Sequence, residues 1–434
     1  MSRVHVGSKK CSRDISSRVV TAAGFRLYMD GPSNHAMKKK AAVLLFTAPI
    51  LNAGTSHAMI SLPSKEEAWI TPAIDIRARY EFGDVDGFDV SHVLTTRERL
   101  GLKTTTLNGF SAFVEGEFSQ ALIDDYNGGA AGADPSVAGN TVIADPETNE
   151  LNQAYLQYSG YETTIKFGRQ RLIYNNAAFI GNVGWRQNEQ TYDAVSLVNT
   201  SIDKLNLNYA FIDQVNRIFG SEAMGIAQNV DSEIHLFNAS YAGIEGVTLG
   251  SYIYLMGFDQ PHGWDNNTFG ISAKGVLGGV DLYAELALQE DAGPLNNDDA
   301  MYFHLTAGKT FGSQSVTLGL EHLDGGFQTP LATVHAFNGF ADAFIGQRIA
   351  GTHNGITDLY LSHTFPIFYG MKWTNVAHAF GDDSMSTGLG WEIDSVWVKK
   401  FSDQFTAIAK LAHFQTEDSL PTTTRFSLEL NYSF

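Results

Sequence analysis

Charged residues recur at every second position on three successive segments of this 434-residue chain. They are Arg77 and Arg79 on the first segment, Arg97, Arg99 and Lys103 on the second, and Glu115 and Glu117 on the third. If the segments pair as strands, such side chains lie about 5 Å apart, so a basic ladder faces an acidic one. Two interpretations stay open: a wall of paired charges that stiffens the protein, or a transverse field that holds a hydrated, charged solute.

The segments that carry these charges alternate between apolar and polar residues. In residues 74–82, Ile74, Ile76 and Tyr80 share one parity, while Arg77 and Arg79 share the other. A period of two with unlike faces predicts strands between two different media. A charge on a lipid-facing position costs about 2–4 kcal/mol for Arg or Lys at mid-bilayer, so we expect the charged face to point into an aqueous lumen.

Eighteen segments of this kind follow Trp69, and the connections between them alternate in length. Short turns of Gly, Asn, Asp, Ser or Pro alternate with longer polar loops, notably residues 121–150, 170–190, 214–232 and 323–354. Short turns at one end and long loops at the other are typical of transmembrane barrels. The sequence therefore predicts an all-β fold, a transmembrane antiparallel β-barrel of about 18 strands, too wide for side chains to fill.

The C-terminal thirteen residues, TTTRFSLELNYSF, alternate strictly and finish on an aromatic residue. They resemble the closing strand of bacterial outer-membrane barrels, where the C-terminal aromatic belongs to the signal read by the barrel assembly machinery. The resemblance assigns that role to Tyr432 and Phe434 and places the chain in the outer membrane of a Gram-negative bacterium, among its lipids and lipopolysaccharide. The alternative is an edge strand of a soluble sandwich.

The N-terminal region does not share the strand pattern. Three lysines, 38–40, precede the apolar stretch 41–51 and the small-residue site Ser56-His57-Ala58. This order predicts a secretory signal peptide over residues 37–58, and we interpret residues 1–36 as an upstream extension that is not native. One transmembrane β-barrel domain then spans residues 59–434.

Charge and cysteine content exclude several classes of function. Residues 1–58 hold nine of the 29 basic and two of the 47 acidic residues, which leaves residues 59–434 with a formal net charge of −25. So acidic a chain is a poor candidate for nucleic-acid binding. The only cysteine, Cys11, lies in the excluded segment, so disulfides and cysteine metal sites are not expected.

Neither a metal site nor an enzyme site is favoured by the spacing of polar residues. Residues 84–89 read DVDGFD, but Thr95 stands where a calcium loop places its bidentate glutamate, which favours a solvated turn. Ser240 with His235, or His363 with Asp358, would be candidates for a hydrolase, although nothing in their spacing supports one. We expect no cofactor.

Residues 167–198 leave one strand, form a loop rich in Gly, Asn and aromatic residues, and return into the next strand. The motifs are Gly168-Arg169-Gln170, Gly181-Asn182, Trp185, Asn188 and Tyr192-Asp193-Ala194, with Arg97, Arg99, Leu100 and Gly101 upstream. With these motifs the chain resembles the alginate-export family of outer-membrane β-barrel porins. The resemblance implies a passive polysaccharide or small-solute channel, with this loop folded into the pore.

We therefore expect a monomeric outer-membrane channel for hydrophilic solutes, possible classes being anionic or carbohydrate. The expected path comprises the basic rungs Arg77, Arg79, Arg97, Arg99 and Lys166, the acidic Glu115 and Glu117, the narrowing loop with Trp185 and Arg186, and Arg171 and Asp193. The alternatives are a structural or adhesive barrel with a plugged lumen and, third, a barrel hydrolase. A trimer has no signal in the sequence.

Overall fold

The computed structural model describes residues 69–129, 135–259, 263–292, 299–351 and 354–434. The predicted extension, residues 1–36, and the predicted signal peptide, residues 37–58, lie outside the described residues. Among those described, no helix is long and apolar enough to cross a membrane.

Eighteen strands make up most of the described chain. They are β1 Ile70–Val85, β2 Ser91–Thr104, β3 Phe110–Asp125, β4 Thr148–Gly160, β5 Thr163–Gln170, β6 Thr191–Asn199, β7 Leu205–Asn216, β8 Val230–Ile244, β9 Val247–Phe258, β10 Asn266–Leu277, β11 Val280–Asp291, β12 Ala300–Phe311, β13 Gln314–Leu323, β14 Ile356–Pro366, β15 Lys372–Gly381, β16 Gly388–Lys400, β17 Phe405–Thr416 and β18 Thr423–Ser433. The helical elements are one α-helix, α1 Ile345–Ala350, and the short 3-10 turns η2 Pro135–Val137, η3 Gly225–Ala227, η4 Val334–Ala336 and η5 Phe368–Gly370.

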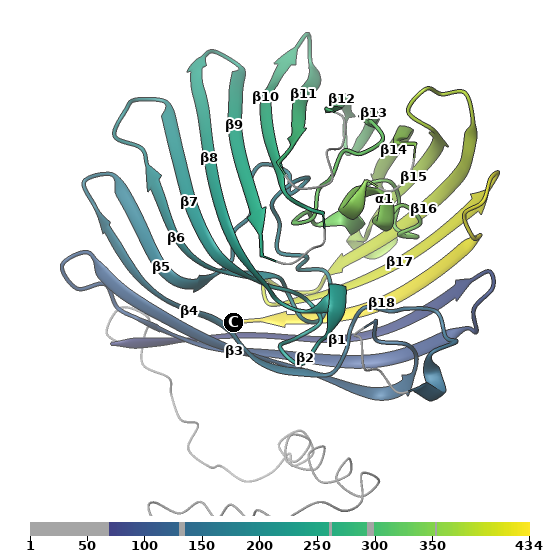
Figure 1. Ribbon diagram of the computed structural model, residues 1–434, viewed down its shortest axis with the longest axis horizontal. Helices are drawn as coiled ribbons and strands as arrows, with labels where there is room; N and C mark the ends of the chain where they lie inside the picture. The colour runs from purple at the N-terminus through teal and green to yellow at the C-terminus, as the bar shows by residue number, and fades with distance from the viewer. Residues whose placement is uncertain (1–68, 130–134, 260–262, 293–298, 352–353) are drawn as a thin grey trace, which may run out of the picture. The chain divides into compact units, whose positions relative to one another are not determined.

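The strands form one closed barrel (Figure 1). Each strand pairs antiparallel with its neighbours in the chain, and β18 also pairs with β1, for example Glu429 with Arg79 and Phe426 with Phe82. Closure leaves no unpaired sheet edge, which a membrane-spanning sheet requires. The predicted antiparallel barrel of 18 strands is confirmed.

The predicted alternation of short and long connections is also present. Two residues join β4 to β5 and β12 to β13, whereas residues 171–190 join β5 to β6 and residues 324–355 join β13 to β14. The sequence predicts a strand over residues 368–380, but in the structure Phe368–Gly370 forms a turn, with Tyr369 at φ 56°, and β15 begins at Lys372.

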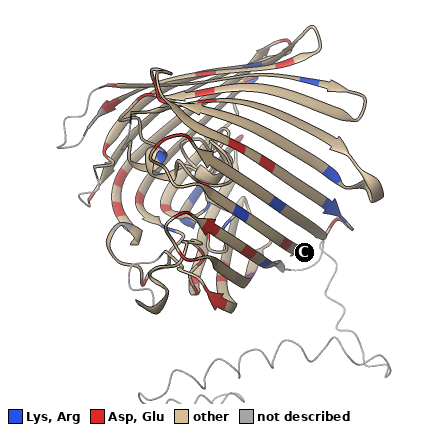
Figure 2. Cartoon of the chain, turned by 90° about the vertical axis from the view of Figure 1, so that its right-hand side faces the viewer, with Lys and Arg blue, Asp and Glu red and all other residues tan. Residues whose placement is uncertain are grey.

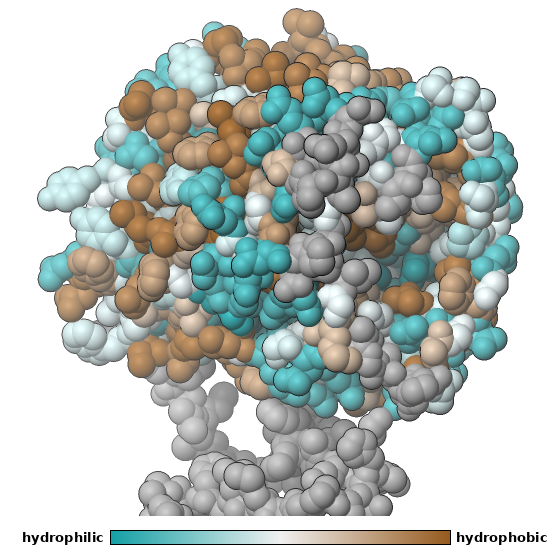
Figure 3. Space-filling view, viewed as in Figure 1, coloured by the Kyte–Doolittle hydropathy of each residue, from teal (hydrophilic) through white to brown (hydrophobic). Residues whose placement is uncertain are grey.

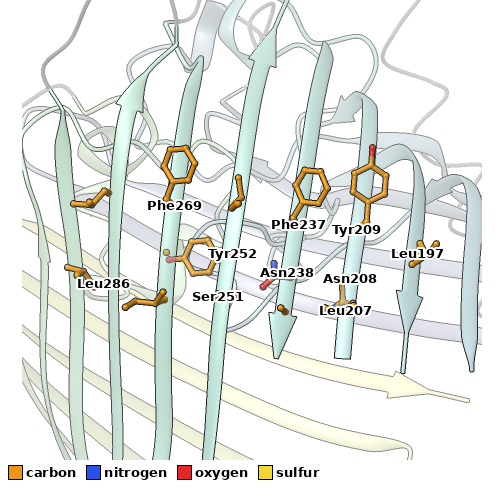
Figure 4. A pocket seen from close by; sticks show the side chains of 15 residues that line it. Leu197, Leu207, Asn208, Tyr209, Phe237, Asn238, Ser251, Tyr252, Phe269 and Leu286 are labelled. Carbon is orange, nitrogen blue, oxygen red and sulfur yellow. The ribbon is translucent and has the colours of Figure 1, made fainter. Parts of the chain in front are cut away.

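The two faces of the wall have opposite character. Outward positions of β6–β11 are apolar and partly exposed, among them Leu207, Phe237, Phe269 and Leu286, and they border a shallow hollow of about 710 Å³ (Figure 4). Hydrophobic residues also gather over parts of the face seen in the space-filling view (Figure 3). Such a surface suits acyl chains, so the polar parity lines the lumen.

Candidate functional site in the barrel lumen

Two long connections fold into the lumen, residues 171–190 and residues 324–355, and we call them the first and second inner loops. Apolar residues of both loops belong to one buried cluster with inward-facing wall residues. Phe179 of the first inner loop has its ring centroid 5.4 Å from that of Tyr252 and 5.1 Å from that of Tyr302. Figure 1 shows α1, part of the second inner loop, within the ring of strands. The loops therefore narrow the lumen from inside.

The basic residues of β1 bind the first inner loop by its backbone. Arg77 donates from Nη1 to the carbonyl oxygens of Trp185 and Arg186, at 2.7 and 3.1 Å, and from Nη2 to that of Gly184 at 3.2 Å. Arg79 also donates to the Trp185 carbonyl. Buried carbonyl groups need partners, so these guanidinium groups fix the position of the loop tip.

Three carboxylates accompany these two arginines, all of them beside Arg79 and one of them also beside Arg77. Glu429 of β18 lies 3.5 Å from Arg77 and 3.9 Å from Arg79, so one carboxylate serves both. Arg79 also forms ion pairs with Asp145 and, at 3.3 Å, with Glu81. Figure 2 shows basic and acidic residues lying close together on the strands.

The residues of β2 and β3 form the pairs expected of adjacent ladders. Arg99 and Glu117 are cross-strand partners and form an ion pair. Arg97 pairs instead with Asp75 on β1. Glu115 accepts hydrogen bonds from two side-chain amides of β4, at 2.8 and 2.9 Å.

Glu189 of the first inner loop joins this network, and the sequence had not singled it out. Its carboxylate accepts a hydrogen bond from Arg171 Nε at 2.7 Å and lies 3.5 Å from Arg99, while its backbone NH donates to Glu117 at 3.0 Å. Burial opposes ionisation of Glu189, but Arg99 and Arg171 outweigh it and lower the pKa of this carboxyl to about 2. Glu189 is therefore ionised, and its carboxylate holds the C-terminal part of the first inner loop in place.

Trp185 connects the first inner loop to the second. Its indole stacks on the His335 imidazole with ring centroids 3.3 Å apart and an interplanar angle of 13°. The next ring in the row is Phe340, 4.9 Å from His335. The Arg186 guanidinium lies 3.8 Å and the Lys410 ammonium 5.3 Å from the Trp185 ring centroid. Cations over an aromatic face are attracted by its electron density.

Ion pairs reinforce the same junction. Arg186 lies 3.3 Å from Glu81, 3.6 Å from Asp145 and 3.4 Å from Asp342 of the second inner loop. Asp342 also lies 2.9 Å from Nδ1 of His335. Together, the ring stack and the ion pairs join segments about 150 residues apart in sequence.

Lys166 and Asp193 occupy different environments from the arginine network. The Lys166 ammonium lies over the ring of Tyr155 at 4.7 Å from its centroid. Asp193 has the parity of the outward residues of β6 and pairs with Arg169 at 2.7 and 2.9 Å. The structure therefore does not bring Asp193 together with the lumen residues.

The C-terminal residues close the barrel. Tyr432 pairs across the strands with Ile76 of β1, and Phe434 exchanges two backbone hydrogen bonds with Ile74, at 2.8 and 3.0 Å. Both aromatic rings are partly exposed on the outer face.

The opposite wall carries an acidic group of which the sequence had pointed only to Asp358, as a hydrolase candidate. Glu321 pairs with Arg348 of α1 at 3.1 Å, and Asp358 lies 2.9 Å from His378. A cavity of about 180 Å³ lies beside them and beside Asp394. Inward parity on β13, β14 and β16 is the signal that could have identified these carboxylates.

The candidate hydrolase pairs point to opposite faces of their strands. Asp358 is buried in the lumen, whereas His363, five residues later, faces outward; Ser240 and His235 are also five residues apart and of opposite parity. Across the described residues, no cluster of three or more His, Cys, Asp or Glu side chains could hold a metal ion.

The motifs around the first inner loop have identifiable structural roles. Gly168 has φ +119°, and a Cβ there would lie 2.3 Å from the Ala154 carbonyl oxygen, so only glycine fits. The Tyr192 hydroxyl donates to the Gly181 carbonyl at 2.7 Å, and Asn182 donates to Glu189 at 2.6 Å. The residues of these motifs therefore stabilise the conformation in which the first inner loop folds into the lumen.

Comparison with known proteins agrees with this architecture. Residues 68–212 match the model of the family described as alginate export, and this range contains β1–β6 and the first inner loop. No curated protein sequence matches the chain significantly.

Solved structures with the same fold include proteins of two bacteria. OccAB4 of Acinetobacter baumannii superposes with a TM-score of 0.67 at 12% identity, covering 85% of this chain and 99% of that one. OpdO of Pseudomonas aeruginosa gives 0.63 at 13% identity over 84% and 97%. The outer membrane protein OpdK of the same organism gives 0.62 at 14% identity over 84% and 99%. Over residues 68–212 the chain is thus similar to the alginate-export family, and over most of its length it has the fold of these solved structures.

Proposed function

We propose that this channel passes hydrophilic, anionic solutes of the carbohydrate class by diffusion. The observation that carries the proposal is the composition of the contacts around Arg77. Its guanidinium binds three neutral backbone carbonyls and the Asn431 side chain, and it shares Glu429 with Arg79. Positive charge whose partners are mostly neutral remains available to attract an anion in the constriction.

Lys410 adds to this positive field. Its ammonium lies 4.9 Å from the ring centroid of Phe340 and 3.2 Å from Nε2 of His335. In the described part of the chain, no carboxylate lies within 4 Å of it. A carboxylate-bearing solute is a natural complement for such a group.

The lumen also offers surface suited to sugar hydroxyls. A hollow of about 490 Å³ on β9–β13 is lined by Thr306, Thr310, Ser315, Thr317 and the ring of Tyr283. These residues occupy inward-facing positions of their strands, in the part of each strand that is close to a short turn. Hydroxyl groups both donate and accept hydrogen bonds, so they exchange readily with water and with saccharides.

A second function, a plugged structural or adhesive barrel, is favoured by one observation. The inner loops bury Ile180, Leu331 and Phe344 with inward wall residues such as Ile234 in one apolar cluster, which fills part of the lumen. Apolar packing of this extent resists displacement by a solute.

Single-channel conductance separates the two functions. Chain extracted from outer membranes would be inserted into planar bilayers, with an oligouronate or a neutral oligosaccharide of equal length added. Open steps blocked more strongly by the oligouronate are expected. Open steps without preferential block would remove the anionic specificity, and absent steps from a folded, heat-modifiable barrel would favour the plugged barrel.

A further inference from the structure

An aromatic pair faces the lumen near the short turns, away from the arginine network. Phe113 of β3 and Tyr155 of β4 have ring centroids 5.6 Å apart. The Phe113 ring covers the lumen side of Gly101, because a Cβ on Gly101 would lie 2.9 Å from two of its ring carbons. Both rings are half-buried, so part of each remains open to the lumen.

Two lysines flank this pair without carboxylate partners. Lys166 lies over the Tyr155 ring, 4.7 Å from its centroid, and Lys103 is the cross-strand partner of Phe113. Lys103 and Arg171 are close enough to act electrostatically on Lys166. Within the described ranges, neither lysine has a carboxylate within 4 Å, whereas Arg171 is paired with Glu189.

The location places these residues at the periplasmic mouth. Lys103 is the penultimate residue of β2, and residues 105–109 form the short turn to β3. Lys166 lies near the start of β5, shortly after the two-residue turn that joins β4 to β5. Short turns lie on the periplasmic side of such barrels. The hydroxyl-lined hollow on β9–β13 is on the opposite wall, since β12 follows β3 by nine of eighteen strands.

We infer that Phe113, Tyr155, Lys103 and Lys166 form a periplasmic subsite for one acidic sugar residue of an anionic saccharide. The apolar C–H face of the sugar packs on the aromatic rings while the ammonium groups bind its carboxylate. The inference rests on the proposed function and specifies where the solute is first held. The constriction arginines are hydrogen-bonded to the first inner loop, and these two lysines are among the cations that a solute reaches first from the periplasm.

The test measures block of single channels by a uronate hexamer added to each side separately. The variant replaces both lysines, Lys103→Gln and Lys166→Gln. The matched control is Lys372→Gln with Lys400→Gln, which removes the same charge from exposed positions near the short turns on β15 and β16.

The subsite predicts that the Lys103/Lys166 variant weakens periplasmic-side block roughly tenfold, as two partly exposed charge contacts would. The control pair is expected to change block by no more than about twofold, because distant charges are screened. Tyr155→Ala is expected to weaken block by the uronate and by a neutral hexamer alike.

The outcomes separate the subsite from the proposed function. Equal loss in both lysine pairs, or unchanged block in the Lys103/Lys166 variant, would overturn the subsite while leaving an anion-passing channel. No block of the unaltered chain from either side would overturn the proposed function and the subsite with it.

Discussion

Removing the Trp185 side chain should loosen the contact between the two inner loops without unfolding the barrel. Trp185→Ala deletes the stack on His335 and the cation contact with Arg186. It leaves the backbone carbonyl that Arg77 and Arg79 bind. The first inner loop should therefore stay in the lumen while its tip separates from the second loop more often.

The magnitude follows from the contacts that are lost. An aromatic stack contributes about 0.5–1.5 kcal/mol to the contact between the loops, whereas the Arg186 contact lies within the first inner loop and does not count toward it. At 1.4 kcal/mol per factor of ten, separation becomes roughly 2- to 12-fold more frequent.

Planar-bilayer recording measures this change directly, as more frequent brief steps to a higher conductance. Trp185→Phe keeps a ring in the stack and should behave nearly like the unaltered chain. Trp391→Ala is the matched control, because Trp391 lies on the outer face and also contacts a histidine, His413, at 5.8 Å. Identical traces for Trp185→Ala and Trp391→Ala, with both barrels folded, would refute the reasoning.

The remaining predictions concern the same loops. Burial lowers the pKa of His335 to about 4 despite the opposing effect of its carboxylate neighbour. The stabilising contribution of His335 is therefore complete above about pH 6.5 and is lost as the pH falls toward 4. Conductance noise should rise over that pH window, and it should not do so in His335→Phe. Glu189→Ala removes the partner of Arg171, whose side chain is 34% exposed, and one of the two carboxylates beside the buried Arg99. The cost should be about 1–3 kcal/mol, so the temperature of the heat-modifiable gel shift should fall. The temperature should fall less for Glu189→Gln, and an unchanged shift would contradict the role of Glu189. Gly168→Ala forces a Cβ against the Ala154 carbonyl oxygen, so the yield of folded barrel should drop sharply. A gel of membrane fractions would show this drop. A normal yield would argue against the backbone conformation described for Gly168.

The fold was predictable because a barrel wall repeats one simple pattern. Alternation, turn chemistry and connection length predicted about eighteen strands, and the adjacency of the first three strands predicted that a basic ladder would face an acidic one, as Arg99 and Glu117 do. These features depend on residues close in sequence or on neighbouring strands.

The site was only partly predictable because it depends on where the long loops lie. Glu189 and His335 carry no periodic signal, and their contacts with Arg99 and Trp185 join segments brought together only by the closed barrel. No pattern in the sequence indicated that Arg77 binds carbonyl groups of the loop instead of facing the aqueous lumen. Long-range contacts of this kind are not encoded in local pattern.

The contacts of Arg77 have a consequence for how the channel should respond to ionic strength. Buried hydrogen bonds from a guanidinium to carbonyl groups are little affected by dissolved salt, whereas the open lysines near the short turns sit within reach of a counterion atmosphere about 8 Å deep at 0.15 M. Concentrated salt should therefore leave the shape of the constriction intact and remove the part of the anion preference that the lysines contribute. The same barrel would sort solutes more by charge in dilute surroundings and more by size in brine.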